Sequence, residues 1–541
     1  MKNILPVRIV ACGGRVENAA ALLLKQTPQI GLREKNTAKI EGKAFLILDF
    51  GREISGGARI LTFSDCEKRT VRLRFGESVS ETCAEIGEKN AGNDHSNRDF
   101  KVELRGYSDM TFGQTGFRFL RVDTEEGARF SIKSILAACD ADEREERGSF
   151  ECDDEEINKI WNTAAYTLRL CMKNGFFWDG VKRDRLVWIG DLYPESRAAH
   201  YVFGDAAETR NSLLFAREED PLPEWVAGMP AYSLWWLIIL HDEYRFGGDL
   251  AFVKEQLPYL RGLIGQISAC VGENGRTRYP GNFIDWPSAW EEGEPEEKRE
   301  ELFSGMNFLT RIAVQKAKDL LAAAGEGAGD AAAECGRILS RLAKAPCPVR
   351  RQKQIAALGA WAGADVDKEV ILRGGEKGLS TFMSYPVLTA MADFGGAEFA
   401  YNAMKKYYGG MLALGATTFW EDFDPAWAEN AFRIDEMPVP GKKDIHGDFG
   451  KACYIGFRHS LCHGWSAGVI PFLAERALGV KIAGAGCASL EIRPELGGLK
   501  RVKGRVPTPR GNVTVEHVLQ ADGSVKSSVS APEGVNVRVL S

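Results

Sequence analysis

The spacing of hydrophobic residues changes twice along this chain of 541 residues, and that change constrains the fold more than any single motif. Up to about residue 146, short runs alternate apolar and polar residues, as half-buried strands do. Ser55-Gly56-Gly57 and Gly106 are predicted to be turns between them. The sequence therefore predicts an N-terminal antiparallel β-sandwich over residues 1–146. Its predicted strands are 45–50, 58–63, 70–75, 102–104 and 117–122.

Helical spacing replaces this alternation near Phe150. Asp153 is a suitable N-cap, acids follow it, and apolar residues then recur on one helical face. Twelve helices of ordinary length with their loops would occupy about 330 residues. The sequence thus predicts an (α/α)6 toroid of six hairpins over residues 147–475. Helical segments are predicted at 206–216, 232–244, 250–271, 303–323, 331–342, 388–392 and 397–408.

Alternation returns after Gly479, at 489–493, 512–517 and 535–539. We therefore predict a small C-terminal β-sandwich over residues 476–541. The complete prediction is a multidomain chain in which a helical toroid is flanked by two β domains.

Charge and composition argue against several classes of partner. The net charge is −6, which disfavours nucleic acid and anionic membrane surfaces. The longest apolar run, LWWLIIL at 234–240, is too short to span a bilayer and predicts a buried helix. Arg8 interrupts the first apolar run, which predicts an edge strand, and the 12 cysteines form no CxxC pair. We expect a cytoplasmic protein that binds a small carbohydrate or glycoside, with its oligomeric state, including a homo-oligomer, left open.

The segment FFWDGVKRDRLVWIGDLYPE, residues 176–195, concentrates acids, cations and aromatic rings. If residues 183–191 are helical, Asp184, Trp188 and Asp191 share one face. Aromatic rings stack on sugar rings, and carboxylates bind hydroxyls or exchange protons at a glycosidic oxygen. The alternative is a solvated helix on which these acids pair with Arg183 and Arg185, with the tryptophan in the core.

A second cluster of acids and aromatic rings lies in GATTFWEDFDPAW, residues 415–427. It contains Glu421 beside Trp420. Inverting glycoside hydrolysis requires two carboxyl groups roughly 6.5 to 9.5 Å apart, whereas a retaining enzyme needs about 5 Å. The alternative interpretation of Glu421 is a surface acid beside a buried tryptophan.

Two further segments contribute candidates for sugar binding. NFIDWPSAW, residues 282–290, offers Asp285, Trp286 and Trp290 in a predicted loop, although both tryptophans could instead anchor that loop to the core. HSLCH, residues 459–463, sets His459 and His463 four residues apart, which is a metal-like spacing without an evident third ligand. We therefore predict no metal site and treat His463 as a sugar contact, or as a hydrogen-bonded core residue.

Glycines in AAAGEGAGDAAAE, residues 322–334, imitate a nucleotide-binding motif. A preceding strand and a phosphate-binding lysine are both missing, so the segment is interpreted as a connection between helices.

With these residues identified, the chain resembles the bacterial α-L-rhamnosidases of glycoside hydrolase family 78. Five blocks match in the same order and together span roughly residues 45–520. The blocks are TGFRFLRV at 115–122, DGVKRDRLVWIGD at 179–191, GATTFWEDF at 415–423, SLCHGWSAGVIPFL at 460–473 and IRPELGGLKRVKGRVPTPRGNVTVE at 492–516.

The resemblance implies single-displacement hydrolysis with inversion and without a cofactor. Asp184 stands at the position of the general acid and Glu421 at that of the base. The resemblance also implies that Asp179 and Asp191 bind sugar hydroxyls, that Trp188, Trp286 and His463 shape the pocket of the minus-one sugar, and that Arg183 orients the carboxylates.

The chain departs from the family pattern at the acid, where the usual glutamate is Asp184. The side chain is one methylene shorter, and a donor displaced by about 1 Å can lose on the order of a hundredfold in rate. Val187 also replaces the usual glycine before Trp188.

The predicted function is exo-acting hydrolysis that releases terminal α-L-rhamnose from oligosaccharides or glycosides. Two alternatives stay open: a carbohydrate-binding protein without turnover, and a glycosidase or lyase of altered sugar specificity on the same scaffold. A lyase would use Tyr193 or His463 as its base with Arg183 facing a uronate.

Overall fold

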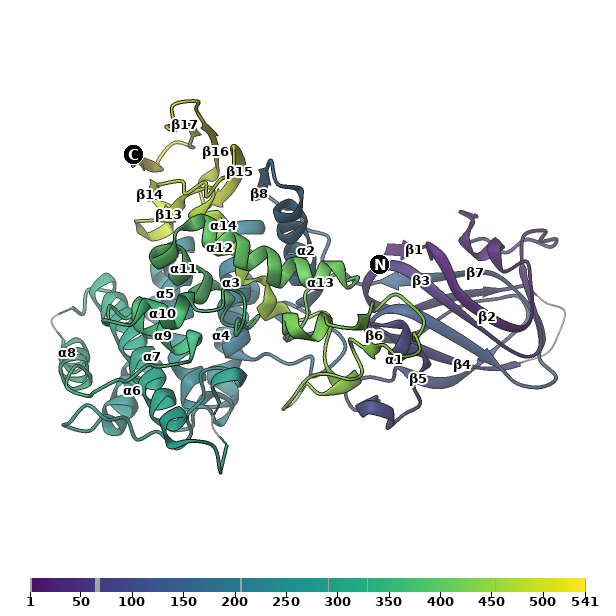
Figure 1. The fold of residues 1–541 in the computed structure, drawn as a ribbon, viewed down its shortest axis with the longest axis horizontal. Coiled ribbons are helices and arrows are strands. Elements are labelled where there is room, and N and C mark those ends of the chain that lie inside the picture. The colour runs from purple at the N-terminus through teal and green to yellow at the C-terminus, as the bar shows by residue number, and fades with distance from the viewer. Residues whose placement is uncertain are drawn as a thin grey trace.

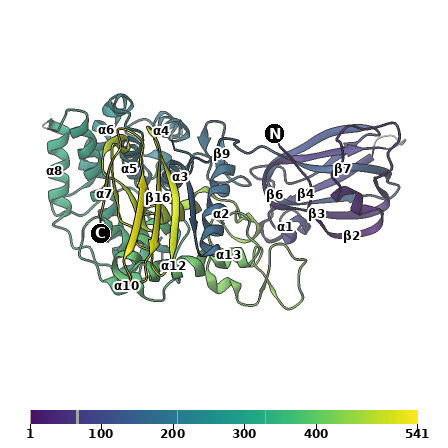
Figure 2. The same ribbon diagram turned by 90° about the horizontal axis from the view of Figure 1, so that it is seen from above.

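The structure is a computed structural model that describes residues 2–63, 69–204, 207–289, 291–327, 329–452 and 454–540. Strands of the N-terminal part lie at one end of an elongated molecule, and a helical body lies at the other (Figure 1). The C-terminal strands pack on the helical body, well away from the N-terminal strands (Figure 2). The chain thus combines a helical part with two β parts.

The N-terminal strands form one connected sheet with the order β1-β7-β3-β6-β4-β5, and β2 pairs with β3. β1 lies at the edge, as predicted for the first residues. The sheet contains β1 (Lys2–Ile4), β2 (Arg8–Glu17), β3 (Ala38–Thr62), β4 (Arg69–Gly76), β5 (Asp99–Leu104), β6 (Ser108–Thr124) and β7 (Arg129–Cys139). A short helix, α1 (Val79–Cys83), follows β4.

The turn predicted at Ser55-Gly56-Gly57 is wrong, because β3 runs through these residues with register shifts on either side. Close approach of the neighbouring strands explains the glycines. A Cβ atom on Gly56 would lie 2.0 Å from the carbonyl oxygen of Ala138, and one on Gly57 would lie 2.2 Å from that of Gly113. The predicted turn at Gly106 is confirmed.

The helical body begins with α2 (Glu155–Cys171), whose N-cap is Asp154 instead of the predicted Asp153. Asp154 accepts hydrogen bonds from the backbone N–H groups of Glu156 and Ile157, whereas Asp153 accepts one from the N–H of Lys500. The neighbouring acid is therefore used to hold the C-terminal part.

The predicted helical segments are confirmed, although the first of them begins at Ala206, which lies outside the described residues. A π-helical turn, Lys405–Gly409, continues the segment predicted at 397–408. The remaining helices are α3 (Ile189–Val202), α4 (Ala207–Glu219), α5 (Pro230–Gly247), α6 (Leu250–Cys270), α7 (Glu296–Ala323), α8 (Asp330–Leu342), α9 (Lys353–Trp361), α10 (Lys368–Leu372), α11 (Ser384–Gly395), α12 (Ala397–Met404), α13 (Gly410–Ala413) and α14 (Val469–Arg476). Short strands between them are β9 (Met172–Lys173), β10 (Phe176–Phe177), β11 (Ala431–Phe432) and β12 (Lys443–Asp444).

The C-terminal part contains two small sheets. One has the order β13-β14-β18 and the other the order β17-β16-β15-β8. Their strands are β8 (Ser149–Cys152), β13 (Val480–Ile482), β14 (Ser489–Ile492), β15 (Arg501–Thr508), β16 (Gly511–Leu519), β17 (Val525–Ser530) and β18 (Asn536–Val539). β8 comes from the start of the helical part, so this part of the chain is tied to the C-terminal strands by sheet hydrogen bonds.

Two large hydrophobic cores hold the described chain together. One lies inside the N-terminal sheet, and the other is shared by the helices and the C-terminal strands. Trp235 and Trp236 of α5 are buried in the second, which confirms a buried helix at LWWLIIL. Within the described residues, no helix combines the length and the apolar character that crossing a bilayer requires.

Candidate active site

Residues 179–188 form a loop, so the condition that residues 183–191 are helical holds only from Ile189 onward. Asp184 and Arg185 adopt left-handed backbone conformations, with φ of 52° and 61°. The Asp179 carboxylate accepts the N–H of Leu186 at 2.9 Å, which closes the loop. α3 begins only after Trp188, its N-cap, and Asp191 lies in its first turn. We call residues 179–188 the acid loop.

The loop nevertheless brings the two candidate catalytic acids together. Arg183 Nη1 donates to Asp184 Oδ2 at 2.9 Å, and Arg183 Nη2 donates to Glu421 Oε1. The two carboxyl groups are therefore separated by no more than one guanidinium and two hydrogen bonds. Asp184 is partly exposed, whereas Arg183 and Glu421 are buried.

Besides the ion pair with Arg183, two hydrogen bonds hold Glu421. Its Oε2 accepts the backbone N–H of Ser460 at 3.1 Å, and its carbonyl oxygen accepts the indole N–H of Trp465 at 2.8 Å. Burial raises the pKa of this carboxyl, but the nearby positive charges of Arg183 and His463 outweigh burial and lower it to about 2. Glu421 is thus a carboxylate at neutral pH.

His463 is buried, and Glu421 and Asp191 are among its charged neighbours. Its Nε2 lies 3.1 Å from Asp191 Oδ1. Burial lowers the pKa of this imidazole, but the Glu421 carboxylate and the hydrogen bond with Asp191 raise it to about 9 overall. Burial raises the pKa of Asp179 well above its usual value and also raises that of Asp191. The group therefore combines a protonated imidazole with carboxyl groups of different proton affinity.

Asp285 and Asp422 form a second acidic pair beside Glu421. Burial raises the pKa of each to about 7. Asp422 adds to the increase at Asp285 and Glu421 adds to that at Asp422, whereas hydrogen bonds and Lys451 oppose it. Ser380 Oγ donates to Asp285 Oδ2, and the N–H of Trp286 donates to Oδ1 at 2.8 Å. Near neutral pH each of these carboxyl groups can donate or accept a proton.

Aromatic rings connect the candidate sugar-binding residues. Trp188 contacts Tyr232 with ring centroids 6.0 Å apart, and Trp286 contacts Tyr454 at 6.2 Å. Both tryptophans are partly exposed. Trp420 is instead 1 % exposed and packs edge-to-face against Phe423 and His459. Trp290, the remaining predicted contact, lies outside the described residues.

The histidines of HSLCH do not converge on one ligand. His459 Nε2 accepts the backbone N–H of Asp422 at 3.0 Å, whereas His463 turns toward Asp191. His463 also lies before a helix rather than in one: the 3-10 turn Gly464–Gly468 follows it and leads into α14.

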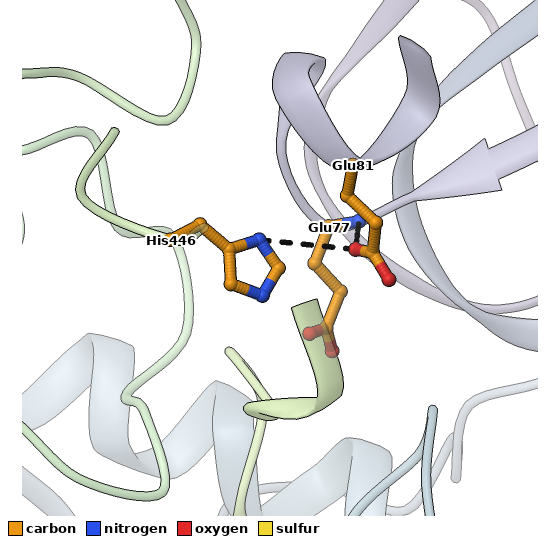
Figure 3. A group of neighbouring side chains, drawn as sticks. All are labelled: Glu77, Glu81 and His446. Carbon is orange, nitrogen blue, oxygen red and sulfur yellow. Dashed lines mark hydrogen bonds and ion pairs between the residues drawn. The ribbon is translucent and has the colours of Figure 1, made fainter. Parts of the chain in front are cut away.

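One buried group has the composition of a metal site. The possible ligand atoms of Glu77, Glu81 and His446 all lie within 4.8 Å of one another. The glutamates come from the N-terminal part and the histidine from a loop of the helical part (Figure 3). The ammonium of Lys182, in the acid loop, lies 2.9 Å from Glu77 and 3.2 Å from Glu81. This lysine supplies the positive charge that the carboxylates need, so the group is best described as a buried ion cluster between the N-terminal part and the acid loop.

Three residues of this neighbourhood were not predicted as site residues: His95, Lys182 and Asp422. His95 Nε2 lies 3.2 Å from Asp184 Oδ1, although the two residues are far apart in sequence. A lone histidine in a polar loop has no spacing that signals such a contact. Lys182 and Asp422 lie inside the recognised motifs, and only their buried partners in the structure distinguish them from the other charged residues there.

Comparison with known families matches two segments of the chain, one in the helical part and one in the C-terminal part. Residues 145–327 match the family model described as the bacterial alpha-L-rhamnosidase 6 hairpin glycosidase domain, and residues 479–540 match that of the bacterial alpha-L-rhamnosidase C-terminal domain. Both segments are therefore similar to domains of bacterial α-L-rhamnosidases, which are glycoside hydrolases. The resemblance stated from the sequence is thereby confirmed.

A curated protein that the chain resembles is an α-L-rhamnosidase of Formosa agariphila, 24 % identical over 281 residues. The match covers 45 % of this chain but only 28 % of the relative, so the chain spans about a quarter of that rhamnosidase's length.

Solved rhamnosidases share the fold across nearly the whole chain. The GH78 rhamnosidase of Bacillus sp. GL1 has a TM-score of 0.73 and 21 % identity, with 96 % of this chain and 55 % of that one covered. The α-L-rhamnosidase of Dictyoglumus thermophilum has a TM-score of 0.72 and 18 % identity, with 99 % and 58 % covered. A Klebsiella oxytoca rhamnosidase with rhamnose bound has a TM-score of 0.64 and 21 % identity, with 87 % and 95 % covered. These likenesses establish a helical part combined with β parts.

Proposed function

We propose that this chain is an inverting, exo-acting glycoside hydrolase that releases terminal α-L-rhamnose from oligosaccharides or glycosides. The observation that carries the proposal is the bridge that Arg183 makes between Asp184 and Glu421. It joins the two acids of widely separated motifs in one small space. The similarity to bacterial α-L-rhamnosidase domains suggests the sugar class, and rhamnose bound to the Klebsiella oxytoca rhamnosidase is consistent with it.

In the proposed reaction Asp184 gives its proton to the glycosidic oxygen as the bond to the anomeric carbon breaks. Glu421 removes a proton from a water molecule whose oxygen attacks that carbon from the opposite face. The leaving alcohol and rhamnose of inverted configuration are the products. The low pKa of Glu421 suits the base, because that group must be ionised when the water arrives.

The sugar is proposed to lie against the partly exposed rings of Trp188 and Trp286. Asp179, Asp191 and Asp285 would bind its hydroxyl groups, with His463 holding Asp191 in place. The buried Trp420 would support the pocket wall from behind, and Trp290 stays a predicted contact.

The architecture proposed with this function is an (α/α)6 toroid over residues 147–475 between β-sandwiches at 1–146 and 476–541. Sheet hydrogen bonds between β8 and β15 add one strand from the start of the toroid to the C-terminal unit. A cytoplasmic location stays a prediction from the sequence.

Two alternatives receive less support from the contacts. Tyr193, the predicted base of a lyase, is stacked in the core on Trp235 and Trp361. His463 has a pKa of about 9 and is protonated at neutral pH, so it is a poor base. A sugar-binding protein without turnover would have the same pocket. It would be recognised by sugar binding without hydrolysis.

The test is a panel of aryl glycosides incubated with the purified chain. We expect release from the α-L-rhamnoside and not from aryl α-mannoside, β-glucoside or β-galactoside. Proton NMR at early times should show the β anomer of rhamnose as the first product. Release of the α anomer would contradict inversion, an unsaturated uronate product would indicate a lyase, and binding of rhamnose without release would indicate a binding protein.

A further inference from the structure

The N-terminal part contacts the acid loop at several points. Ser96 Oγ lies 3.4 Å from the carbonyl oxygen of Lys182, and Arg185 Nη2 donates to Gln114 Oε1 at 2.6 Å. Gly116 of β6 allows this close approach, since a Cβ atom there would lie 2.8 Å from the backbone nitrogen of Lys182. The loop that carries the proposed acid is therefore held by the β part as well as by the helices.

Among these contacts, His95 reaches the acid itself. Its Nε2 lies 3.2 Å from Asp184 Oδ1 and also 3.2 Å from Asp94 Oδ2. Both are close contacts, without the alignment of a hydrogen bond in the resting structure. Arg183 occupies the other oxygen, Oδ2. Oδ1 is thus the oxygen left for proton exchange, and an imidazole stands beside it.

Charged side chains surround this pair. Asp94 and Asp184 both face the imidazole. Arg458 pairs with Asp94 and lies 4.0 Å from Asp184 Oδ1. The His95 side chain is 24 % exposed although its Nε2 atom is buried, so water reaches the ring at its other atoms. A small cavity adjoins His95, and its charged lining includes Asp94, Lys182, Arg183 and Arg458.

We propose that His95 is a positioning residue that shares one proton with Asp184 and so prepares it to act as the acid; this inference rests on the proposed hydrolysis. The proton moves from His95 Nε2 to Asp184 Oδ1 and then to the glycosidic oxygen, which takes the electron pair of the breaking bond. Asp184 is left as a carboxylate, and His95 recovers a proton from solvent. The N-terminal part thereby contributes to catalysis.

Leaving-group dependence tests this role. The dinitrophenolate leaving group of a dinitrophenyl rhamnoside departs without protonation. The alkoxide leaving group of an alkyl rhamnoside must be protonated as it departs. We expect His95→Ala to lower kcat by about 10-fold to 100-fold on the alkyl rhamnoside and by less than about 3-fold on the dinitrophenyl rhamnoside. The alkaline limb of its kcat/KM profile should move to lower pH, and added imidazole should restore part of the alkyl rate.

His95→Gln serves as the conservative variant, because its amide can contact Asp184 but cannot exchange a proton. It should resemble His95→Ala in its rates without imidazole. Lys101→Met is the matched control on the same β part, since Lys101 is exposed and, among the described residues, pairs with exposed Glu125. Circular dichroism and thermal melting of each variant verify folding.

The outcomes separate the two proposals. Two results with an active wild type would overturn the role of His95 alone. In the first, His95→Ala keeps the wild-type rate on the alkyl rhamnoside. In the second, it loses the rates on both substrates equally and its pH profile does not move. A wild type that is inactive on both substrates would overturn the proposed hydrolysis and this inference with it. Selective loss on the alkyl substrate with rescue by imidazole would support the shared proton.

Discussion

Arg183 and Glu421 form a buried ion pair, and the second nitrogen of the same guanidinium holds Asp184. This arrangement explains how a buried glutamate stays ionised: the pKa of Glu421 is about 2 in spite of burial. It also orients both proposed catalytic acids through one rigid planar group, which presents its donors in a fixed geometry. The predictions below follow from these charges.

Replacing Arg183 should raise the pKa of Glu421, because the closest positive charge is lost. Activity that requires the Glu421 carboxylate falls as pH drops through this pKa. The acid limb of the kcat/KM profile of Arg183→Met should therefore move to higher pH, with a loss of about 10²-fold or more at neutral pH. Rate measurements between pH 3 and 9 check this. Arg129→Met, on the exposed edge of the β part, is the control, and an unshifted acid limb in Arg183→Met would refute the assignment.

His463 should stabilise the fold in a pH-dependent way. Its pKa is raised from about 6.5 to about 9, so its contribution is fully present below pH 6.5 and is lost as pH rises through 9. At one pKa unit per 1.36 kcal/mol, this contribution is at most about 3 kcal/mol. The difference in thermal stability between wild type and His463→Gln should shrink between pH 6 and pH 10.

A second buried histidine, His517, serves as a control because its contribution to stability should depend on pH in the opposite direction. The pKa of His517 is lowered by burial, so its neutral form is favoured in the fold and its contribution is lost as pH falls. The difference between wild type and His517→Gln should shrink toward low pH. Parallel trends in the two variants would contradict the assigned environments.

Asp285 should bind the sugar but lower the stability of the fold once its carboxyl group is ionised. Its pKa is about 7, so the folded state prefers the neutral carboxyl, and the stability that this preference supplies is lost as pH rises from about 4 to 7. Asp285→Asn keeps an oxygen that can accept the N–H of Trp286 and removes the buried charge. Above pH 7 the variant should unfold at the wild-type temperature or higher, while KM for the rhamnoside rises by about 10-fold or more. A variant with lower stability and unchanged KM would show that Asp285 serves the fold alone.

Lys182 should be essential to the junction of the β part and the acid loop. Its ammonium contacts Glu77, Glu81 and two backbone carbonyl oxygens, and burial raises the pKa of Glu77 to about 7. Removal leaves buried carboxylates uncompensated, so Lys182→Met should lose about 3–5 kcal/mol in the free energy of unfolding measured in urea.

Adding Glu77→Gln to Lys182→Met removes one of the stranded charges and should recover part of that loss. A wild type whose melting temperature rises with added divalent cation would instead show that the glutamates and His446 bind a metal. A single variant within about 0.5 kcal/mol of wild type would contradict the ion cluster as a source of stability.

Much of the fold was predictable because its elements are long and periodic. Helices such as α5 and α7 bury one face or more, so their apolar spacing is visible in the sequence. The turn predicted at Gly56 failed because glycine also permits close strand contact, and local sequence does not distinguish the two causes.

The candidate site was predictable in its residues and not in its geometry. A helix over residues 183–191 would have placed Asp184, Trp188 and Asp191 on one face. The Asp179 carboxylate instead binds the N–H of Leu186, and the backbone of Asp184 is left-handed. His95 could not be found at all, because its contact with Asp184 depends on how the β part packs on the helical part.

The most direct test of the account compares the turnover of Asp184→Asn and Glu421→Gln on an alkyl α-L-rhamnoside. Asp424→Asn is the matched control, since Asp424 is exposed and lies three residues after Glu421. The account predicts that each of the first two variants loses at least about 10²-fold in kcat while the control keeps wild-type turnover. Wild-type turnover in either Asp184→Asn or Glu421→Gln would contradict it.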